Sequence, residues 1–139
     1  MTAVDSSVLI AGLLSWHEFH GRALQALAKL ISARLLLIPL PALIESYSVM
    51  TRLPSPHRLH PEIAYQLLRE SFSESRIVGL FPRNAWMFLG ECVTAGISGG
   101  RVYDAVIASA AIAASASELL TFNPRDFEAF GDRIAIIVP

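Results

Sequence analysis

The chain has 139 residues, 53% of them hydrophobic, and its 11 basic and 12 acidic residues give a net charge of −1. This length suits one domain with its own core, and the balanced charge excludes nucleic-acid binding through overall charge alone. The apolar runs "LLLIPLPALI" and "AVIASAAIAASA" are shorter than the roughly 20 residues that span a bilayer, so we expect no membrane span.

Apolar patterns predict strands and helices in alternation along the chain. The predicted strands are short apolar runs bounded by polar residues, glycine or proline, and they cover residues 2–4, 34–39, 76–81, 118–122 and 133–139. The predicted helices, several with apolar residues spaced three and four apart, cover residues 6–14, 17–33, 39–53, 61–72, 82–96 and 101–116, and a turn with a short helix follows at 123–130.

Residues at the helix ends support these boundaries. Ser6 or Ser7 is the expected N-cap of the first helix, proline opens the third and fourth helices, and Gly96 ends the fifth. Strands separated by helices of these lengths predict an α/β fold in which helices cover both faces of a parallel sheet. In such a sheet the ligand site lies outside the carboxyl ends of the strands.

Two features indicate a cytoplasmic protein. Asp5 interrupts the only apolar run near the N-terminus, which also lacks the basic start of a secretory signal. The single cysteine, Cys92, has no partner for an internal disulfide, and its surroundings indicate helix packing in a reducing compartment.

Four of the twelve acidic residues lie close to the predicted carboxyl edge of the sheet. Asp5 ends the first strand, Glu45 follows the second strand by about one helical turn, and Asp126 follows the fourth strand. Asp104 lies in the first turn of a helix that begins after "SGG", a flexible connection that can direct it to the same edge. Sheet topology can therefore bring these four side chains together although they are far apart in the chain.

Each of these acids also has an ordinary structural explanation. Asp5 and Asp126 suit helix caps, and Asp104 suits a first-turn position favoured by the helix dipole. Glu45 suits an ion pair with an arginine such as Arg22 or Arg52. Four acids at one edge are harder to explain in this way, so we favour a shared function for them.

The shared function that we predict is metal binding. Two carboxylates about 4 Å apart repel by about 4 kcal/mol at an effective dielectric constant near 20, so a cluster of them needs a cation. Oxygen ligands without cysteine or histidine favour Mg²⁺ or Mn²⁺, which can activate water for phosphodiester hydrolysis. Arg101 and Arg125 are candidates for holding backbone phosphates, and ordinary surface charge is the alternative for both.

Four motifs in this order resemble one known family. The stretches "AVDSSVLI", "LPALIESYSV", "GGRVYDAVIASAAIA" and "LLTFNPRDF" are similar to motifs of PIN-domain proteins, in particular the VapC-type toxins of bacterial toxin–antitoxin pairs. The resemblance covers essentially the full length and implies a single PIN-like domain over residues 1–139, with a three-layer α/β/α sandwich. It also implies an Mg²⁺- or Mn²⁺-dependent ribonuclease, a homodimer, and inhibition by a VapB-like antitoxin.

The resemblance assigns roles residue by residue. Asp5, Glu45 and Asp104 correspond to the first three acids of the family motif, while Ser7 and Thr121 correspond to supporting hydroxyl residues.

The fourth acidic position departs from the family pattern. Asn123 stands where the family often has an aspartate two residues after the threonine, and it offers a carbonyl oxygen but no charge. Asp126 is the candidate that replaces this charge.

An antitoxin that binds through an apolar segment needs exposed apolar residues on the toxin. The candidates are Leu13, Leu14, Trp16, Tyr47 and Met50. Ordinary core packing is the expected alternative for Leu13, Tyr47 and Met50, and Trp16 is the preferred contact.

Two other functions remain open from the sequence. A catalytically weak PIN-like module that binds RNA or protein is motivated by Asn123. A phosphatase that uses Asp5 as nucleophile is less favoured, because the sequence lacks a second aspartate two residues later and a suitably placed lysine.

Overall fold

The computed structural model describes all 139 residues and contains one five-stranded sheet. Every neighbouring pair of strands is parallel, and the order across the sheet is β3-β2-β1-β4-β5. The strands are β1 (Thr2–Val4), β2 (Leu36–Pro39), β3 (Arg76–Val78), β4 (Glu118–Leu120) and β5 (Ala135–Ile137). The predicted α/β fold with a central parallel sheet is confirmed.

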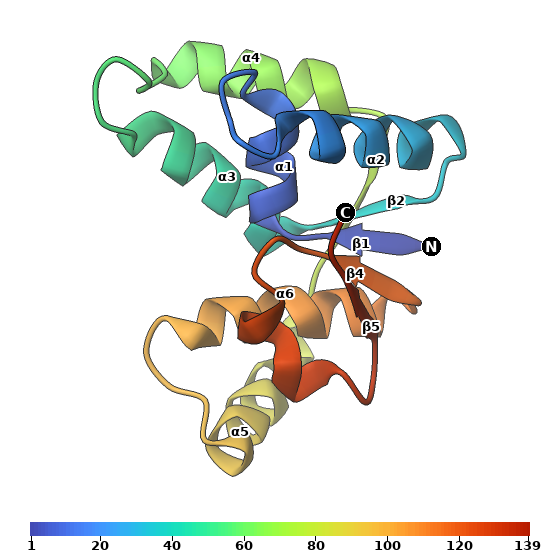
Figure 1. Cartoon of the computed structure of the whole chain (residues 1–139). Coiled ribbons are helices and arrows are strands. Elements are labelled where there is room, and N and C mark those ends of the chain that lie inside the picture. Colours follow the sequence, from blue (N-terminus) through green and yellow to red (C-terminus); the bar gives the residue numbers. More distant parts are fainter.

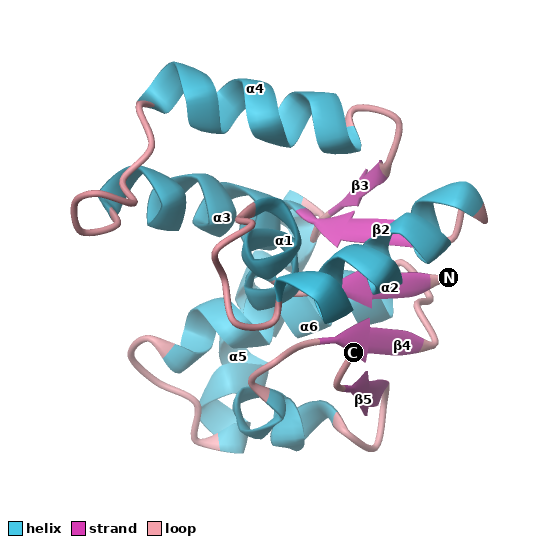
Figure 2. Ribbon diagram, turned by 45° about the horizontal axis from the view of Figure 1, so that its top comes forward, coloured by secondary structure: helices cyan, strands magenta, loops and turns pink.

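Helices cover both faces of this sheet. The helices are α1 (Ser6–Leu13), α2 (His20–Ser32), α3 (Leu40–Arg52), α4 (Pro61–Phe72), α5 (Ala85–Ala95) and α6 (Arg101–Ala113), with short 3₁₀ segments at Pro82–Asn84 and Pro124–Phe130. In Figure 1, α1, α2 and α4 lie above the strands, and α5 and α6 lie below them. Helix α3 continues from the end of β2 away from the sheet (Figure 2).

The core is one cluster of 28 buried hydrophobic residues centred on β1, whose Ala3 and Val4 are completely buried. Small residues allow close packing on both faces of the sheet. The inner face of α6 is rich in alanine, with Ala108 and Ala111 fully buried. Gly12 lies where α1 meets α2, and a Cβ at this position would overlap the side chain of Leu27.

Several predicted boundaries are wrong in detail. Residues 14–19 form a series of turns instead of the start of the second helix, which begins at His20. Here the Nδ1 atom of His17 accepts the backbone N–H of Phe19 at 3.1 Å, which replaces a helical hydrogen bond. The third strand ends at Val78, three residues earlier than expected, and the segment predicted to open the fifth helix starts as a 3₁₀ turn.

The predicted N-cap of α1 is also wrong. Asp5, rather than either serine, occupies the cap position, and its backbone carbonyl accepts the amides of Val8 and Leu9. The Asp5 side chain makes no capping hydrogen bond to the backbone. Both serine hydroxyls are directed to carboxylates, as described below, because these lie within reach at the start of the helix.

The predicted antitoxin contacts divide into buried and exposed residues. Leu14 and Met50 are 5% and 0% exposed and belong to the core, so Leu14 is wrong as a candidate contact, whereas the core packing expected for Met50 is confirmed. Leu13 is partly buried against the core, whereas Trp16 and Tyr47 are 48% and 38% exposed.

No helix has both the length and the apolar character needed to cross a bilayer.

Candidate acidic site at the carboxyl edge of the sheet

The sheet reverses its strand order at β1. The chain passes from β1 outward to β2 and β3, and then returns to the other side of β1 to add β4 and β5. Ligands of open parallel sheets bind at such a reversal, outside the carboxyl ends of the strands. Asp5 is the first residue after β1, and Thr121 is the first residue after β4.

The strand register places these two residues side by side. Val4 is paired with Leu120, so the next residue of each strand, Asp5 and Thr121, follows at the same level. The backbone N–H of Asp5 donates to the carbonyl of Leu120 at 2.9 Å, which continues the ladder by one step. Asp5 is only 3% exposed and therefore needs hydrogen-bond partners for its charge.

Hydroxyl groups supply those partners. Ser7 Oγ and Thr121 Oγ1 each donate to Asp5 Oδ2 at 2.8 Å. The same two hydroxyls accept the backbone amides of Phe122 at 3.0 Å and Asn123 at 2.9 Å. The network therefore holds the Asp5 carboxylate in one orientation and attaches the loop after β4 to the start of α1.

Ser6 connects Asp5 to Glu45. Its hydroxyl oxygen lies 2.8 Å from Glu45 Oε2 and 3.1 Å from Asp5 Oδ1, so one proton serves two carboxylates. Glu45 is partly buried in the second turn of α3 and has no arginine partner, because the only salt bridge in the molecule joins Arg133 to Glu91. The alternative that Glu45 pairs with Arg22 or Arg52 is therefore wrong.

The remaining two acids complete one electrostatic cluster. The pKa of Asp104 is raised from 3.8 to about 6, first by burial and then by the negative charges of Asp126, Asp5 and Glu45. Arg101 opposes this shift. Asp104 lies in the first turn of α6, and Asp126 lies in the first turn of the 3₁₀ segment after β4. The other three predicted acids thus act on Asp104 from elements that are far apart in the chain.

Asn123, Arg101 and Arg125 lie around this cluster with exposed side chains. The Asn123 side chain does not cap the 3₁₀ segment that it precedes. Neither arginine forms a salt bridge, so both guanidinium groups remain available to phosphate oxygens.

The donor set fits a hard divalent cation. Its carboxylate and hydroxyl oxygens match the ligand preference of Mg²⁺ and Mn²⁺. The pKa of Asp104 is raised partly by the negative charge of its neighbours, which a bound cation would neutralise. No three carboxylate, histidine or cysteine side chains converge as a complete set of metal ligands. Magnesium usually binds through one or two carboxylates and several waters, so an incomplete set of this kind suits it.

The sequence pattern predicted Ser6 only as a helix cap and did not predict its hydrogen bonds to Asp5 and Glu45. The available signal was the pair of adjacent hydroxyls after Asp5 in "VDSS". In the first turn of a helix, neighbouring side chains point in different directions, so the two serines can serve different carboxylates. Ser7 forms hydrogen bonds to Asp5 and to the loop after β4, while Ser6 forms hydrogen bonds to Asp5 and to Glu45 of α3.

Comparison with known proteins identifies the family. The PIN domain model matches residues 2–132 of the chain. The chain belongs to the PIN-domain family. Ribonuclease VapC40 of Mycobacterium tuberculosis is 35% identical over 130 residues, which cover 94% of this chain and 92% of that protein. Ribonuclease VapC27 of the same organism is 38% identical over 128 residues, which cover 88% and 85%. The predicted resemblance to VapC-type PIN proteins is confirmed.

Three solved structures share the fold. The sarcin-ricin loop cleaving toxin VapC20 of M. tuberculosis superposes with a TM-score of 0.70 at 13% identity, covering 100% of both chains. A chain of FitAcB from Neisseria gonorrhoeae has a TM-score of 0.68 at 18% identity and covers 99% of this chain and 96% of its own. A chain of Rickettsia felis VapBC2, bound to promoter DNA, has a TM-score of 0.64 at 18% identity, with 99% and 98% coverage.

Proposed function

We propose that this PIN-domain protein is a metal-dependent endoribonuclease and the toxin of a VapBC-type pair, acting as one domain over residues 1–139 in the cytoplasm. The observation that carries this proposal is the group of four carboxylates at the strand reversal, in which Asp104 has a pKa raised to about 6 by burial and by the other three acids. Similarity to two ribonucleases over most of the chain supports the same reaction class.

Asp5, Glu45, Asp104 and Asp126 are the proposed holders of the cation. Mg²⁺ or Mn²⁺ bound there would promote deprotonation of a water and stabilise the negative charge that develops on the phosphate. Asp5 contributes a fixed charge, because two hydroxyls hold one of its oxygens at 2.8 Å.

The arginines and Asp104 complete the proposed mechanism. Arg101 and Arg125 are the proposed contacts of the RNA backbone phosphates, which offsets the lack of net positive charge on the protein. The pKa of Asp104 is raised to about 6, and a cation bound beside it would favour its ionised form.

Cleavage of a single-stranded RNA with and without Mg²⁺ or Mn²⁺ tests this function. We expect cleavage that EDTA abolishes and that falls by at least about 100-fold in Asp5→Asn and in Asp104→Asn, a loss of the size expected when a charged group at the reaction centre is removed. The second variant matters because Asp104 is less buried than Asp5, so its replacement disturbs the fold less.

Glu118→Gln is the matched control. Glu118 begins β4, at the amino ends of the strands and so away from the acidic cluster, and it accepts a hydrogen bond from Thr2 at 3.0 Å. Its replacement removes one carboxylate but leaves the acidic cluster intact. Full cleavage in both Asp5→Asn and Asp104→Asn would overturn the assigned site.

A catalytically weak PIN-like module is the second candidate, favoured by Asn123 at the fourth acidic position. It predicts RNA or protein binding without metal-dependent cleavage, and no detectable binding of Mn²⁺ at millimolar concentration by calorimetry. Detectable Mn²⁺ binding that is lost in Asp104→Asn would exclude it.

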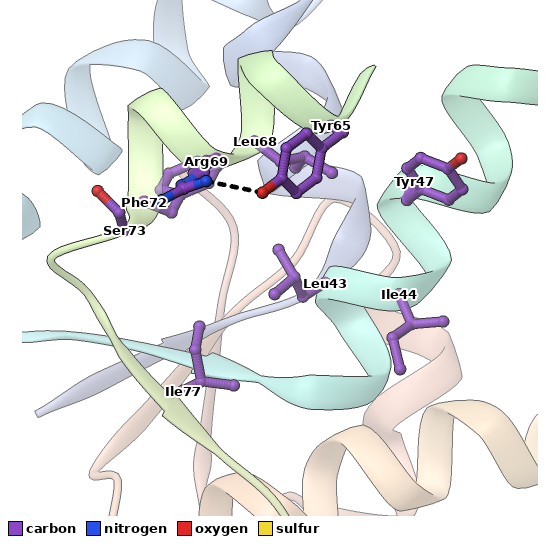
Figure 3. Close-up of a pocket in the computed structure, with 9 residues that line it drawn as sticks. All are labelled: Leu43, Ile44, Tyr47, Tyr65, Leu68, Arg69, Phe72, Ser73 and Ile77. Carbon is purple, nitrogen blue, oxygen red and sulfur yellow. Dashed lines mark hydrogen bonds between the residues drawn. The ribbon is translucent and has the colours of Figure 1, made fainter. Parts of the chain in front are cut away.

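An apolar pocket between α3 and α4 is the proposed binding site for a VapB-like antitoxin. The pocket has a volume of about 380 Å³, and Leu43 of α3 lies below Tyr65 of α4 in it, with Ile44 and Phe72 also in its lining (Figure 3). The exposed Tyr47, a predicted antitoxin contact, also lines this pocket. A hydrophobic helix or strand of the antitoxin would cover surface that is otherwise exposed to water.

Substitution of pocket residues tests this partner. We expect Ile44→Asp and Tyr65→Glu to abolish binding of the VapB-like protein encoded beside the toxin gene, measured by calorimetry, while RNA cleavage persists. Ile63 is 51% exposed on α4 but does not line the pocket, so Ile63→Asp serves as the control. Unchanged binding in both pocket variants would contradict the assignment.

A homodimer formed through α5 is the third part of the proposal. Trp86 and Val93 are 84% and 82% exposed, and Met87 and Leu89 add further exposed apolar surface on the same helix. A patch of this kind is typical of a protein interface. We expect a dimer in analytical ultracentrifugation that Val93→Glu converts to a folded monomer, whereas a monomeric wild-type protein would refute this part alone.

A further inference from the structure

A row of aromatic rings lies along the loop between α1 and α2. Phe122, next to the acidic site, stacks on Phe19 with ring centroids 4.6 Å apart. The row continues from Phe19 to His17 at 5.8 Å and from His17 to Trp16 at 6.1 Å. It ends where Trp16 stacks on His57 of the α3–α4 loop at 4.0 Å. This row, from Phe122 to His57, is called the aromatic row below.

The aromatic row begins at the acidic cluster. The backbone N–H of Phe122 donates to Ser7 Oγ, and the same hydroxyl donates to the Asp5 carboxylate. The Ser7 hydroxyl therefore links the backbone of Phe122, the first residue of the row, to the carboxylate that is proposed to hold the cation. Nucleotides next to a phosphate held at Asp5 would therefore lie near the start of the aromatic row.

Core packing does not explain the outer end of the row. Phe19 and Phe122 are partly buried against the core cluster, but Trp16 lies outside this cluster and is 48% exposed. The imidazole of His57 stacks on the indole, and Trp16 as a whole residue still remains 48% exposed. A large aromatic ring that is held rigidly but left exposed is suited to binding another flat ring at little entropic cost.

The charge around the row favours a polyanion. The guanidinium of Arg22 lies over the rings of Phe19 and Phe122 at 5.7 and 5.6 Å and has no carboxylate partner. The segment from 46 to 61, which supplies His57, contains no acidic residue, and its basic side chains are Arg52, His57, Arg58 and His60. Glu18 is the only acid in the α1–α2 loop.

We propose that the aromatic row is a stacking surface for unpaired bases of the RNA substrate, with Trp16 as its main contact. This inference rests on the proposed ribonuclease function and adds the form of RNA that the site selects. Aromatic faces beside cationic groups bind successive bases of single strands with little sequence preference. Bases inside a duplex are already stacked on each other, so the row selects single-stranded segments or loops.

Trp16 fluorescence tests the contact directly. The chain has two tryptophans, and Trp86→Phe leaves Trp16 as the only one, while Asp104→Asn prevents cleavage during the measurement. We expect single-stranded oligouridine to quench the fluorescence of this double variant in a saturable manner, and a blunt RNA duplex to bind more weakly. Saturable oligouridine binding without any change in Trp16 fluorescence would overturn the proposal.

Steady-state kinetics test its contribution to substrate binding. Trp16→Leu keeps an apolar side chain but removes the ring, so we expect KM for single-stranded RNA to rise about 5- to 150-fold with little change in kcat. Trp16→Phe restores a ring and is expected to recover most of the affinity. Ile63→Ala, at a similarly exposed apolar residue on α4, is the control.

The results separate this inference from the proposed function. Absence of cleavage in the wild-type protein refutes the ribonuclease assignment, whereas normal cleavage with equal KM in wild type and Trp16→Leu refutes only the stacking surface. Loss of VapB-like protein binding in Trp16→Leu, with RNA binding unchanged, would assign the row to a protein contact and overturn the proposal.

Discussion

Thr121 and Asp5 are joined by a hydrogen bond of 2.8 Å, although the two residues are 116 positions apart in the chain. Thr121 is completely buried, and its hydroxyl also accepts the backbone N–H of Asn123 at 2.9 Å. This single hydroxyl therefore satisfies a buried carboxylate on one side and a loop amide on the other. It links the stability of the fold to the geometry of the proposed catalytic site.

Thr121→Val is expected to destabilise the protein although its side chain keeps nearly the same shape. The substitution removes a hydrogen bond to a charged group and leaves both partners short of one hydrogen bond, which costs about 1.5–3 kcal/mol in the free energy of unfolding. Urea denaturation followed by circular dichroism measures this change. Thr121→Ser, which keeps the hydroxyl, is the control, and equal stability of wild type and Thr121→Val would contradict the role of the bond.

Asp104 is expected to make the metal-free protein less stable as pH rises. Its pKa of about 6 in the folded protein exceeds the ordinary value of 3.8, mainly because of burial and then because of three neighbouring carboxylates. The folded state therefore binds this proton more tightly than the unfolded state. The stabilising contribution is complete below pH 3.8 and is lost as pH rises through about 6.

Comparison with Asp104→Asn isolates this effect. In EDTA, the unfolding free energy of the wild type relative to the variant should fall by about 1 kcal/mol between roughly pH 4 and pH 8, an amount reduced for solvent screening because the side chain is partly exposed. Addition of Mn²⁺ at pH 8 should reverse the difference in favour of the wild type. Parallel stability curves in EDTA would count against a raised pKa.

Asp126 is expected to matter more than Asn123 for metal binding. Asp126 carries a charge that acts on Asp104, whereas the exposed Asn123 is neutral. We expect Asp126→Asn to weaken Mn²⁺ binding by about 10-fold, the effect of about 1.4 kcal/mol, and Asn123→Ala to change it by less than about threefold. Isothermal titration calorimetry measures the Mn²⁺ affinity of the two variants and of the wild type. A larger loss in Asn123→Ala would move the fourth ligand position to that residue.

Arg101→Gln is expected to weaken RNA binding in a salt-dependent manner. Arg101 is exposed and free of salt bridges, and it lies close enough to Asp104 to lower the pKa of that group. Loss of one phosphate contact should reduce the slope of log affinity against log salt concentration by about 0.7 for single-stranded RNA. Arg133, paired with Glu91 at 4.0 Å, provides the control Arg133→Gln. Equal slopes in the two variants would exclude the contact.

Local pattern predicted the order of the elements well. Apolar runs bounded by proline or polar residues marked all five strands, and Asp5, which directly follows the first strand, was predicted at the carboxyl edge of the sheet. The same pattern failed at residues 14–19. There, aromatic side chains stack on each other and on the α3–α4 loop, and the backbone adopts turns instead of a helix.

The sequence by itself determined the type and order of the strands and helices, because burial and backbone hydrogen bonding impose local periodicity. It placed three acids at strand ends and one at a helix start, and it carried the family motifs. Only the tertiary structure decided the partners of each side chain. Ser6 reaches Glu45 and Ser7 reaches Phe122 because the parallel register of β1 with β2 and β4 aligns their ends. Register depends on contacts between segments far apart in the chain, which no local pattern contains.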